Sequence, residues 1–112
     1  MSQVGAKHIL QKHVGSRNPN DSYRNKVITR SKEAAIANIE NFKAQIKSVE
    51  DFDRIAAEFS ECRSAGNNGD LGMFGPGQMQ KAFEDAAFGI NVGDISGLVD
   101  TDSGIHIILR YA

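Results

Sequence analysis

The sequence contains one cysteine, no tryptophan and two prolines in 112 residues. A single cysteine excludes a disulfide within the chain, which agrees with a reducing compartment. A zinc site is not expected either, because Cys62 stands alone and the three histidines lack the spacing of zinc ligands. We therefore expect a protein without a metal and without a cofactor. The histidines are His8, His13 and His106.

Long hydrophobic runs are also missing. No apolar stretch approaches the roughly 18 residues needed to cross a bilayer. The first ten residues, MSQVGAKHIL, have no apolar core of a signal peptide. We expect a cytoplasmic and nuclear protein with no membrane partner. The length fits one compact domain, so we predict a single domain over residues 1–112 that acts as a monomer.

The charge is small in total but unevenly distributed. The net charge is −1, yet residues 1–32 carry seven bases against the one acid Asp21, and the rest carries six bases against thirteen acids. A basic segment on an acidic body favours an anionic partner, and a solvated loop is the alternative. A nucleic acid is not expected as that partner, because no aromatic platform lies among the bases. These bases are Lys7, Lys12, Arg17, Arg24, Lys26, Arg30 and Lys32.

Hydrophobic periodicity predicts an α+β domain with the order β-α-α-β-α-β-β and one small, largely antiparallel sheet of four strands flanked by helices. Apolar residues at helical spacing predict a helix from Ser31 to about Lys47 and a second helix capped by Ser48. Between the first strand and the first helix, residues 13–30 form a long polar loop, of a length typical of functional or disordered segments. The predicted strands are 5–12, 71–74, 95–100 and the central 104–111, and a third helix covers 81–88.

Glycine is concentrated in the stretch CRSAGNNGDLGMFGPGQM, from Cys62 to Met79, which holds five of the eleven glycines. No lysine follows them in the register of a phosphate-binding Walker loop, and the glycine spacing is not that of a dinucleotide site. The sequence therefore argues against a nucleotide site here. Glycines also permit sharp turns and close backbone approach, so we interpret this stretch as the turn from a helix into a strand beside a shallow cleft.

Cys62 has two interpretations. It follows the second helix, so we expect it to lie away from a helix N-terminus, where thiols are most reactive. A buried, inert thiol is one reading, and a nucleophile assisted by His106 is the other. By the two-residue period of strands, His8 and His106 would form one polar spot on an apolar sheet, either as core histidines or as part of a site.

Three segments resemble the parvulin family of peptidyl-prolyl cis/trans isomerases. They are AKHIL near the start, FSECRSAGNNGDLGMFGPGQMQKAFEDAAF in the middle and TDSGIHIILR at the end. Together they cover nearly the whole chain in the order and spacing of the family. The loop HVGSRNPNDSYRNKVITR resembles the branch that prefers phosphoserine- or phosphothreonine-proline bonds. The resemblance implies the parvulin fold, an FKBP-like superfold, in a single-domain form without the WW module.

The resemblance implies a set of catalytic residues. His8 and His106 match the paired sheet histidines of the family, and Thr101 matches their partner in the hydrogen-bonding network. Cys62 matches the position that faces the reacting peptide bond, and Ser103 lines the same site.

The resemblance also implies a binding site for the proline ring. Leu71, Met79 and Phe83 match the pocket that grips the ring, and Gln80 beside them matches a substrate-binding position. Without the resemblance, Leu71, Met79 and Phe83 would read simply as core residues. Met73 stands where the family usually has a smaller residue, so we expect a narrower pocket rim.

A phosphate site follows from the same resemblance. Lys12 and Arg17 match two members of the basic phosphate triad, but Asn18 stands where the family ordinarily has a second arginine. The loop is also one residue longer than usual before Tyr23. The expected partners are therefore proteins with phosphorylated Ser/Thr-Pro sites, and Arg24, Lys26 or Arg30 could replace the missing cation.

Isomerisation suits these residue types. An X-Pro bond turns over in tens to hundreds of seconds unaided, because amide resonance imposes a barrier of roughly 18–20 kcal/mol. An enzyme must favour the twisted amide over both planar forms, and each ~1.4 kcal/mol of that preference gives about a tenfold faster rate. Rotation moves no proton, so neither histidine is assigned as a base. We favour Cys62 as a polarisable wall over a nucleophile.

Three other functions stay open at this point. The chain could be a general parvulin without phosphate preference or a noncatalytic module that binds phosphopeptides. It could also be a cysteine hydrolase that uses Cys62 with His106, although no oxyanion-hole motif is evident.

Overall fold

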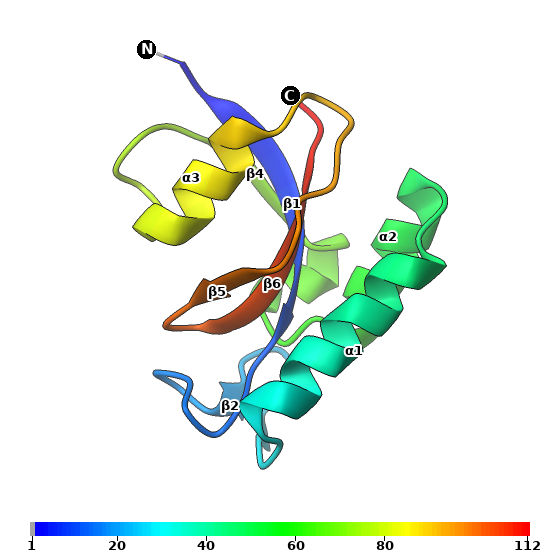
Figure 1. Ribbon diagram of the computed structural model, residues 1–112, viewed down its shortest axis with the longest axis vertical. Coiled ribbons are helices and arrows are strands. Elements are labelled where there is room, and N and C mark those ends of the chain that lie inside the picture. Colours follow the sequence, from blue (N-terminus) through cyan, green and yellow to red (C-terminus); the bar gives the residue numbers. More distant parts are fainter. Residues whose placement is uncertain (1) are drawn as a thin grey trace.

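A four-stranded antiparallel sheet is the centre of the computed structural model, which describes residues 2–112 (Figure 1). The strand order across the sheet is β4-β1-β6-β5, so the first and the last strand of the chain are the two central ones. This confirms the predicted α+β class and the central position of the last strand. The four strands are β1 (Val4–Gln11), β4 (Asp70–Phe74), β5 (Val99–Thr101) and β6 (Gly104–Arg110).

The sheet has a hydrophobic core on each face. On one face, Ile9 and the odd-numbered residues of β6 pack against α1 (Lys32–Gln45) and α2 (Val49–Phe59). On the other face, Val4, Ala6 and Ile108 pack against α3 (Lys81–Gly89). Figure 1 shows α3 on one side of the strands and α1 and α2 on the other. Alternation of side chains along each strand therefore separates the two cores.

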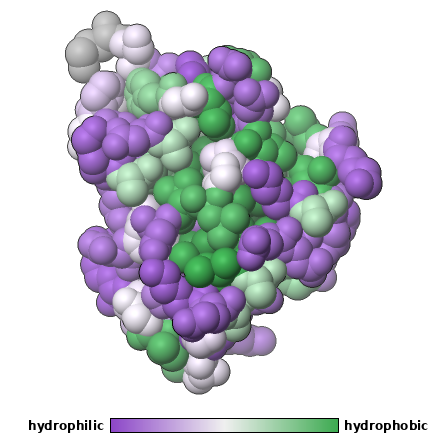
Figure 2. All heavy atoms as spheres, in the orientation of Figure 1, coloured by the Kyte–Doolittle hydropathy of each residue, from purple (hydrophilic) through white to green (hydrophobic). Residues whose placement is uncertain are grey.

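The first two helices begin where predicted, and each has a serine cap, of which Ser48 was predicted. The Ser31 hydroxyl accepts a hydrogen bond from the Ala34 backbone N–H, and the Ser48 hydroxyl accepts one from Asp51. Figure 2 shows hydrophobic residues gathered along the centre of this face of the molecule, with hydrophilic residues around them. Beneath the surface, the buried residues Ile39 of α1 and Phe52 of α2 pack against the sheet in one core.

Two parts of the chain differ from the sequence-based prediction. The predicted strand 95–100 is shorter, because Ser96 interrupts the ladder: its hydroxyl accepts the Ile108 backbone N–H, and β5 begins only at Val99. Ile95 still forms an isolated bridge with Leu109. The loop 13–30 contains a small hairpin that the sequence did not predict, with strands β2 (Asn20–Asp21) and β3 (Lys26–Val27).

The glycine-rich stretch forms a tight passage from α2 into β4. A 3-10 helix, η1 (Arg63–Asn67), follows α2 after an interval of three residues, so Cys62 lies at a helix start and the opposite expectation is wrong. The prediction missed η1 because five residues are too short to show a helical period. Gly69 has φ +80°, and a Cβ there would lie 2.4 Å from the carbonyl oxygen of His8. Only glycine allows this close contact between the passage and β1.

None of the helices in residues 2–112 is both long and apolar enough to cross a membrane.

Candidate active site

An apolar pocket of about 180 Å³ opens between α3, the central strands and the glycine-rich passage. Phe83 is 3% exposed and lies at its buried end, whereas Leu71 and Met79 are only partly buried. The structure brings together all the residues that the resemblance assigned to catalysis and to the proline ring. The lining residues are His8, Cys62, Leu71, Met79, Gln80, Phe83, Thr101, Ser103 and His106.

A chain of hydrogen bonds forms the polar wall of the apolar pocket. The two Nδ1 atoms of His8 and His106 are 3.0 Å apart, and Nε2 of His106 is 2.7 Å from Oγ1 of Thr101. The Thr101 hydroxyl also accepts the backbone N–H of Ser103. The Phe83 ring packs edge-on against both imidazoles, with centroids 5.5 Å and 5.2 Å apart. These contacts fix both histidine rings.

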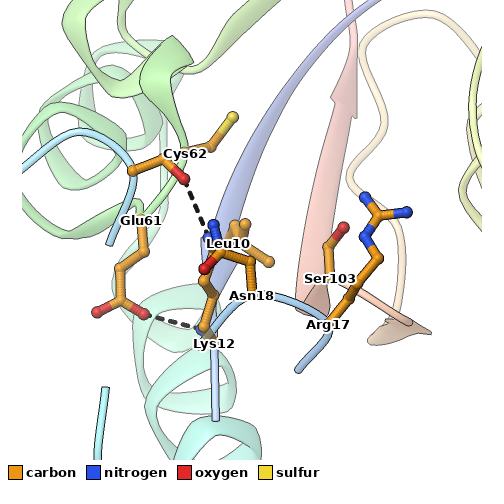
Figure 3. A pocket seen from close by; sticks show the side chains of 8 residues that line it. Leu10, Lys12, Arg17, Asn18, Glu61, Cys62 and Ser103 are labelled. Carbon is orange, nitrogen blue, oxygen red and sulfur yellow. Dashed lines mark hydrogen bonds between the residues drawn. The ribbon is translucent and has the colours of Figure 1, made fainter. Parts of the chain in front are cut away.

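A second, basic pocket of about 200 Å³ lies where β1 runs into the long loop (Figure 3). Its basic side chains are Lys12 and Arg17. Lys12 is 5% exposed, and its ammonium donates hydrogen bonds to the Asn20 carbonyl and the Ser22 hydroxyl. The Arg17 backbone N–H donates to the Asp102 carbonyl at 2.7 Å, which fastens the loop to the β5–β6 turn. The lining residues are Leu10, Lys12, Arg17, Asn18, Ser22, Glu61, Cys62 and Ser103.

The two pockets share a wall. Cys62 and Ser103 line both of them, so the apolar pocket and the basic pocket adjoin at these two side chains. The Ser103 hydroxyl also accepts a hydrogen bond of 2.8 Å from the Gln80 amide, which joins the start of α3 to the β5–β6 turn. A ligand that fills both pockets must therefore pass over Cys62 and Ser103.

Residues 8–111 match the PPIC-type peptidyl-prolyl isomerase domain of the rotamases. The chain belongs to this family of peptidyl-prolyl cis/trans isomerases, the parvulins. The predicted family, fold and enzyme class are thereby confirmed.

Individual relatives agree with the family. The chain is 53% identical to dodo of Drosophila melanogaster over 98% of its own length and 66% of that protein. It is 47% identical to the peptidyl-prolyl cis-trans isomerase Pin1 of Arabidopsis thaliana, of which it covers 96%. Among solved structures, the isomerase ESS1 of Candida albicans has a TM-score of 0.92 at 37% identity, over 98% of this chain and 63% of that one. TbPIN1 has a TM-score of 0.87 at 42% identity over the full length of both chains.

The geometry of this parvulin domain is not that of a cysteine hydrolase. The two ring nitrogens of His106 are engaged by His8 and by Thr101, so the imidazole has no free acceptor for a proton from Cys62. Nucleophilic catalysis would need such a base within hydrogen-bond reach of the thiol. The arrangement therefore does not support a nucleophilic pair of Cys62 and His106, and Cys62 lies in the wall that the two pockets share.

Burial keeps the histidine pair of the parvulin domain neutral at pH 7. Desolvation lowers the pKa of His8 from 6.5 to about 4. Desolvation also lowers the pKa of His106 well below its usual value, and the neighbouring His8 lowers it further. Two neutral imidazoles can share one proton between their Nδ1 atoms and keep the polar wall uncharged. A neutral wall suits a rotation in which no proton is transferred.

Acid should destabilise the parvulin domain through this pair. Between pH 6.5 and 4, an unfolded histidine binds a proton that the buried native one does not, so the stabilisation present above pH 6.5 is lost as the pH falls. At pH 5 the loss from His8 alone should be about 2 kcal/mol of unfolding free energy. Urea denaturation at pH 7.5 and pH 5 measures it. The variant His8→Gln should show a weaker pH dependence, and an unchanged dependence would contradict this origin.

Several expectations about other residues in the parvulin domain are corrected. Met73 does not narrow the pocket rim, because its sulfur lies over Gly5 at the β1–β4 pairing and the side chain is 51% exposed. Arg24 does not replace the missing phosphate cation, because its guanidinium is bonded to Asp21 and to carbonyls at the end of α2. Arg30 and Lys26 line a different groove with Arg24, between the loop and the helices.

Three residues of the basic pocket were not named as candidates by sequence reasoning. Leu10, Ser22 and Glu61 line it, and all three lie within the segments that carried the resemblance, although none was assigned a role there. A serine in a polar loop and one acid after a helix have no distinctive pattern in the sequence. Their role depends on the pairing of β1 with the segment after α2, through the Glu61 backbone N–H and the Leu10 carbonyl.

Proposed function

We propose that this isomerase acts on phosphoserine- and phosphothreonine-proline bonds. The observation that carries the proposal is the shared wall: a pocket with two cations adjoins an apolar pocket at Cys62 and Ser103. A phosphate on the residue before proline and the proline ring itself need these two environments side by side. The likeness to proteins named Pin1 and ESS1 supports the same class of isomerase.

The basic pocket offers a phosphate both charge and hydrogen-bond donors. Phosphate carries close to two negative charges and strong acceptor oxygens. Lys12 supplies a compact charge whose position is fixed by Asn20 and Ser22, and Arg17 supplies a fork of donors. Asn18 adds a neutral side chain where a further cation would increase the attraction. We therefore propose a real but moderate preference for phosphorylated substrates.

Holding the two ends of the substrate would leave its central amide free to rotate. The ring would rest on Phe83 between Leu71 and Met79, and the phosphate would rest on Lys12 and Arg17. The carbonyl between them would pass the thiol of Cys62 and the hydroxyl of Ser103, where bulk water is partly excluded. Desolvation weakens amide resonance, and the two anchors favour the twisted form over both planar forms.

The decisive experiment compares matched peptides that differ only in a phosphate on the serine before proline. Exchange spectroscopy measures cis/trans interconversion directly, and we expect kcat/KM to be about 10- to 100-fold higher for the phosphorylated peptide, since charge-assisted hydrogen bonds contribute about 1.5–3 kcal/mol. Equal rates would mean a general parvulin. Binding of the phosphopeptide without faster exchange would mean a noncatalytic phosphopeptide module.

A further inference from the structure

Lys12 lies just beyond the last paired residue of β1. The pairing of β1 with β6 ends at Gln11 opposite Ile105, so the backbone of Lys12 is outside the ladder. Two side chains hold it instead. The Lys12 backbone N–H donates to Oε1 of Glu61 at 2.8 Å, and its carbonyl accepts from Nη1 of Arg30 at 2.9 Å.

Glu61 and Arg30 also bind each other through a two-fold contact. Nη1 of Arg30 is 2.6 Å from Oε1 of Glu61, and Nη2 is 3.0 Å from Oε2. Such paired hydrogen bonds fix geometry as well as charge. The Glu61 side chain is 7% exposed and that of Arg30 is 27% exposed, so the pair is largely shielded from water. Both terminal nitrogens of the Arg30 guanidinium are thus already bonded to Glu61.

The same pair connects Lys12 to the wall shared by the two pockets. Glu61 directly precedes Cys62, and its backbone N–H donates to the Leu10 carbonyl at 2.9 Å. Arg30 closes the base of the long loop, because its carbonyl accepts the backbone N–H of Val14 at 3.0 Å. Glu61 and Arg30 therefore fix the backbone of Lys12 relative to the segment that carries Cys62, and the contacts with Asn20 and Ser22 fix its ammonium.

We propose that Glu61 and Arg30 are positioning residues that set the preference of this isomerase for phosphate. They hold the backbone of Lys12 beside the segment that carries Cys62, which lies in the wall shared by the basic pocket and the apolar pocket. Glu61 also needs Arg30 for a second reason: an unpaired carboxylate in the wall of the basic pocket would repel a phosphate. The inference rests on the proposed preference for phosphorylated substrates.

The test uses the variants Glu61→Gln, Arg30→Gln and the double variant, each assayed on the matched phosphorylated and plain peptides. The readout is the ratio of the two kcat/KM values in one sample, which does not depend on the fraction of folded enzyme. We expect each single variant to lower this ratio about tenfold through a higher KM for the phosphopeptide, a loss of about 1.4 kcal/mol in binding. The double variant should be no worse than the singles, because the two residues act as a unit.

Asp53→Asn is the matched control. Asp53 forms the ion pair with Lys7 that ties α2 to β1, with side chains 27% and 17% exposed. This variant should keep the wild-type ratio, since it also breaks a partly buried ion pair, but one that does not contact Lys12.

Two outcomes would overturn the inference, and they are distinguishable. In the first outcome, the ratio is well above one in the wild type and keeps the same value in Glu61→Gln and Arg30→Gln. This outcome would reject the positioning role but not the proposed function. A merely structural role would give this result too, because turnover of both peptides would then fall in proportion. A wild-type ratio of one would reject the proposed function and the positioning role with it.

Discussion

Replacing Arg17 by glutamine is expected to remove most of the preference for a phosphorylated peptide, because a charge-assisted contact with phosphate contributes about 1.5–3 kcal/mol. Arg17 lines the basic pocket, and its side chain is exposed, so its removal leaves the core packing in place. The fold-change should appear in kcat/KM for the phosphopeptide and much less in that for the plain peptide. Exchange spectroscopy on both peptides measures it.

Arg54→Gln gives the matched control for charge. Arg54 lies on α2 with a side chain 60% exposed. Its replacement by glutamine changes the net charge by the same amount as Arg17→Gln, but outside the basic pocket. It should leave the preference unchanged at an ionic strength near 0.15 M, where exposed charges are screened beyond about 8 Å. A similar loss in both variants would mean that only the overall charge attracts the substrate.

Replacing Phe83 by alanine is expected to have the largest effect on all substrates. The ring is 3% exposed and contacts both histidines, so its removal should cost about 3–5 kcal/mol of unfolding free energy. It also removes the side chain on which the proline ring would rest in the proposed complex. Burial of such an apolar group contributes about 1.5–3 kcal/mol, so kcat/KM per folded molecule should fall about 10- to 100-fold for phosphorylated and plain peptides alike.

Phe88→Ala separates the two effects of the Phe83 substitution. Phe88 packs on the same core through Phe74, at a centroid distance of 6.2 Å, but it does not line the apolar pocket. It should lower stability while the folded fraction retains wild-type turnover. Urea denaturation gives the folded fraction for each variant. If Phe83→Ala behaved like Phe88→Ala in the activity assay, Phe83 would be a core residue only.

Much of the fold could be predicted from the sequence because its signals are local. The stripes that contain Ile39 and Phe52 have helical period, Ser31 and Ser48 cap the helices, and GIHIILRY has the branched residues of a buried strand. The alternation along β1 and β6 also placed His8 and His106 on one face. Apolar residues at a helical or a strand spacing within one short segment were enough to predict these elements.

The rest depends on contacts between distant segments. The ion pair of Arg30 and Glu61 joins residues 31 positions apart, and neither residue type is unusual in its place. The interruption of the strand before β5 depends on a single hydroxyl, that of Ser96, which no propensity describes. The position of Arg24 likewise depends on the geometry of the loop, which directs its guanidinium to the end of α2 rather than to the basic pocket. The sequence shows how many basic residues the loop contains, but it does not show which groups they bond.

The two ends of the described chain meet at one corner of the molecule. Gly5 exchanges backbone hydrogen bonds with Tyr111 and Ala112, and Figure 1 shows the N and C ends near each other, away from the hairpin of β2. The basic pocket lies toward the other end of β1, near Lys12, and the apolar pocket adjoins it at Cys62 and Ser103. A tether or a fused module at either terminus would thus leave the route of a long, unfolded substrate chain unobstructed, and the same proximity makes the domain suited to circular permutation.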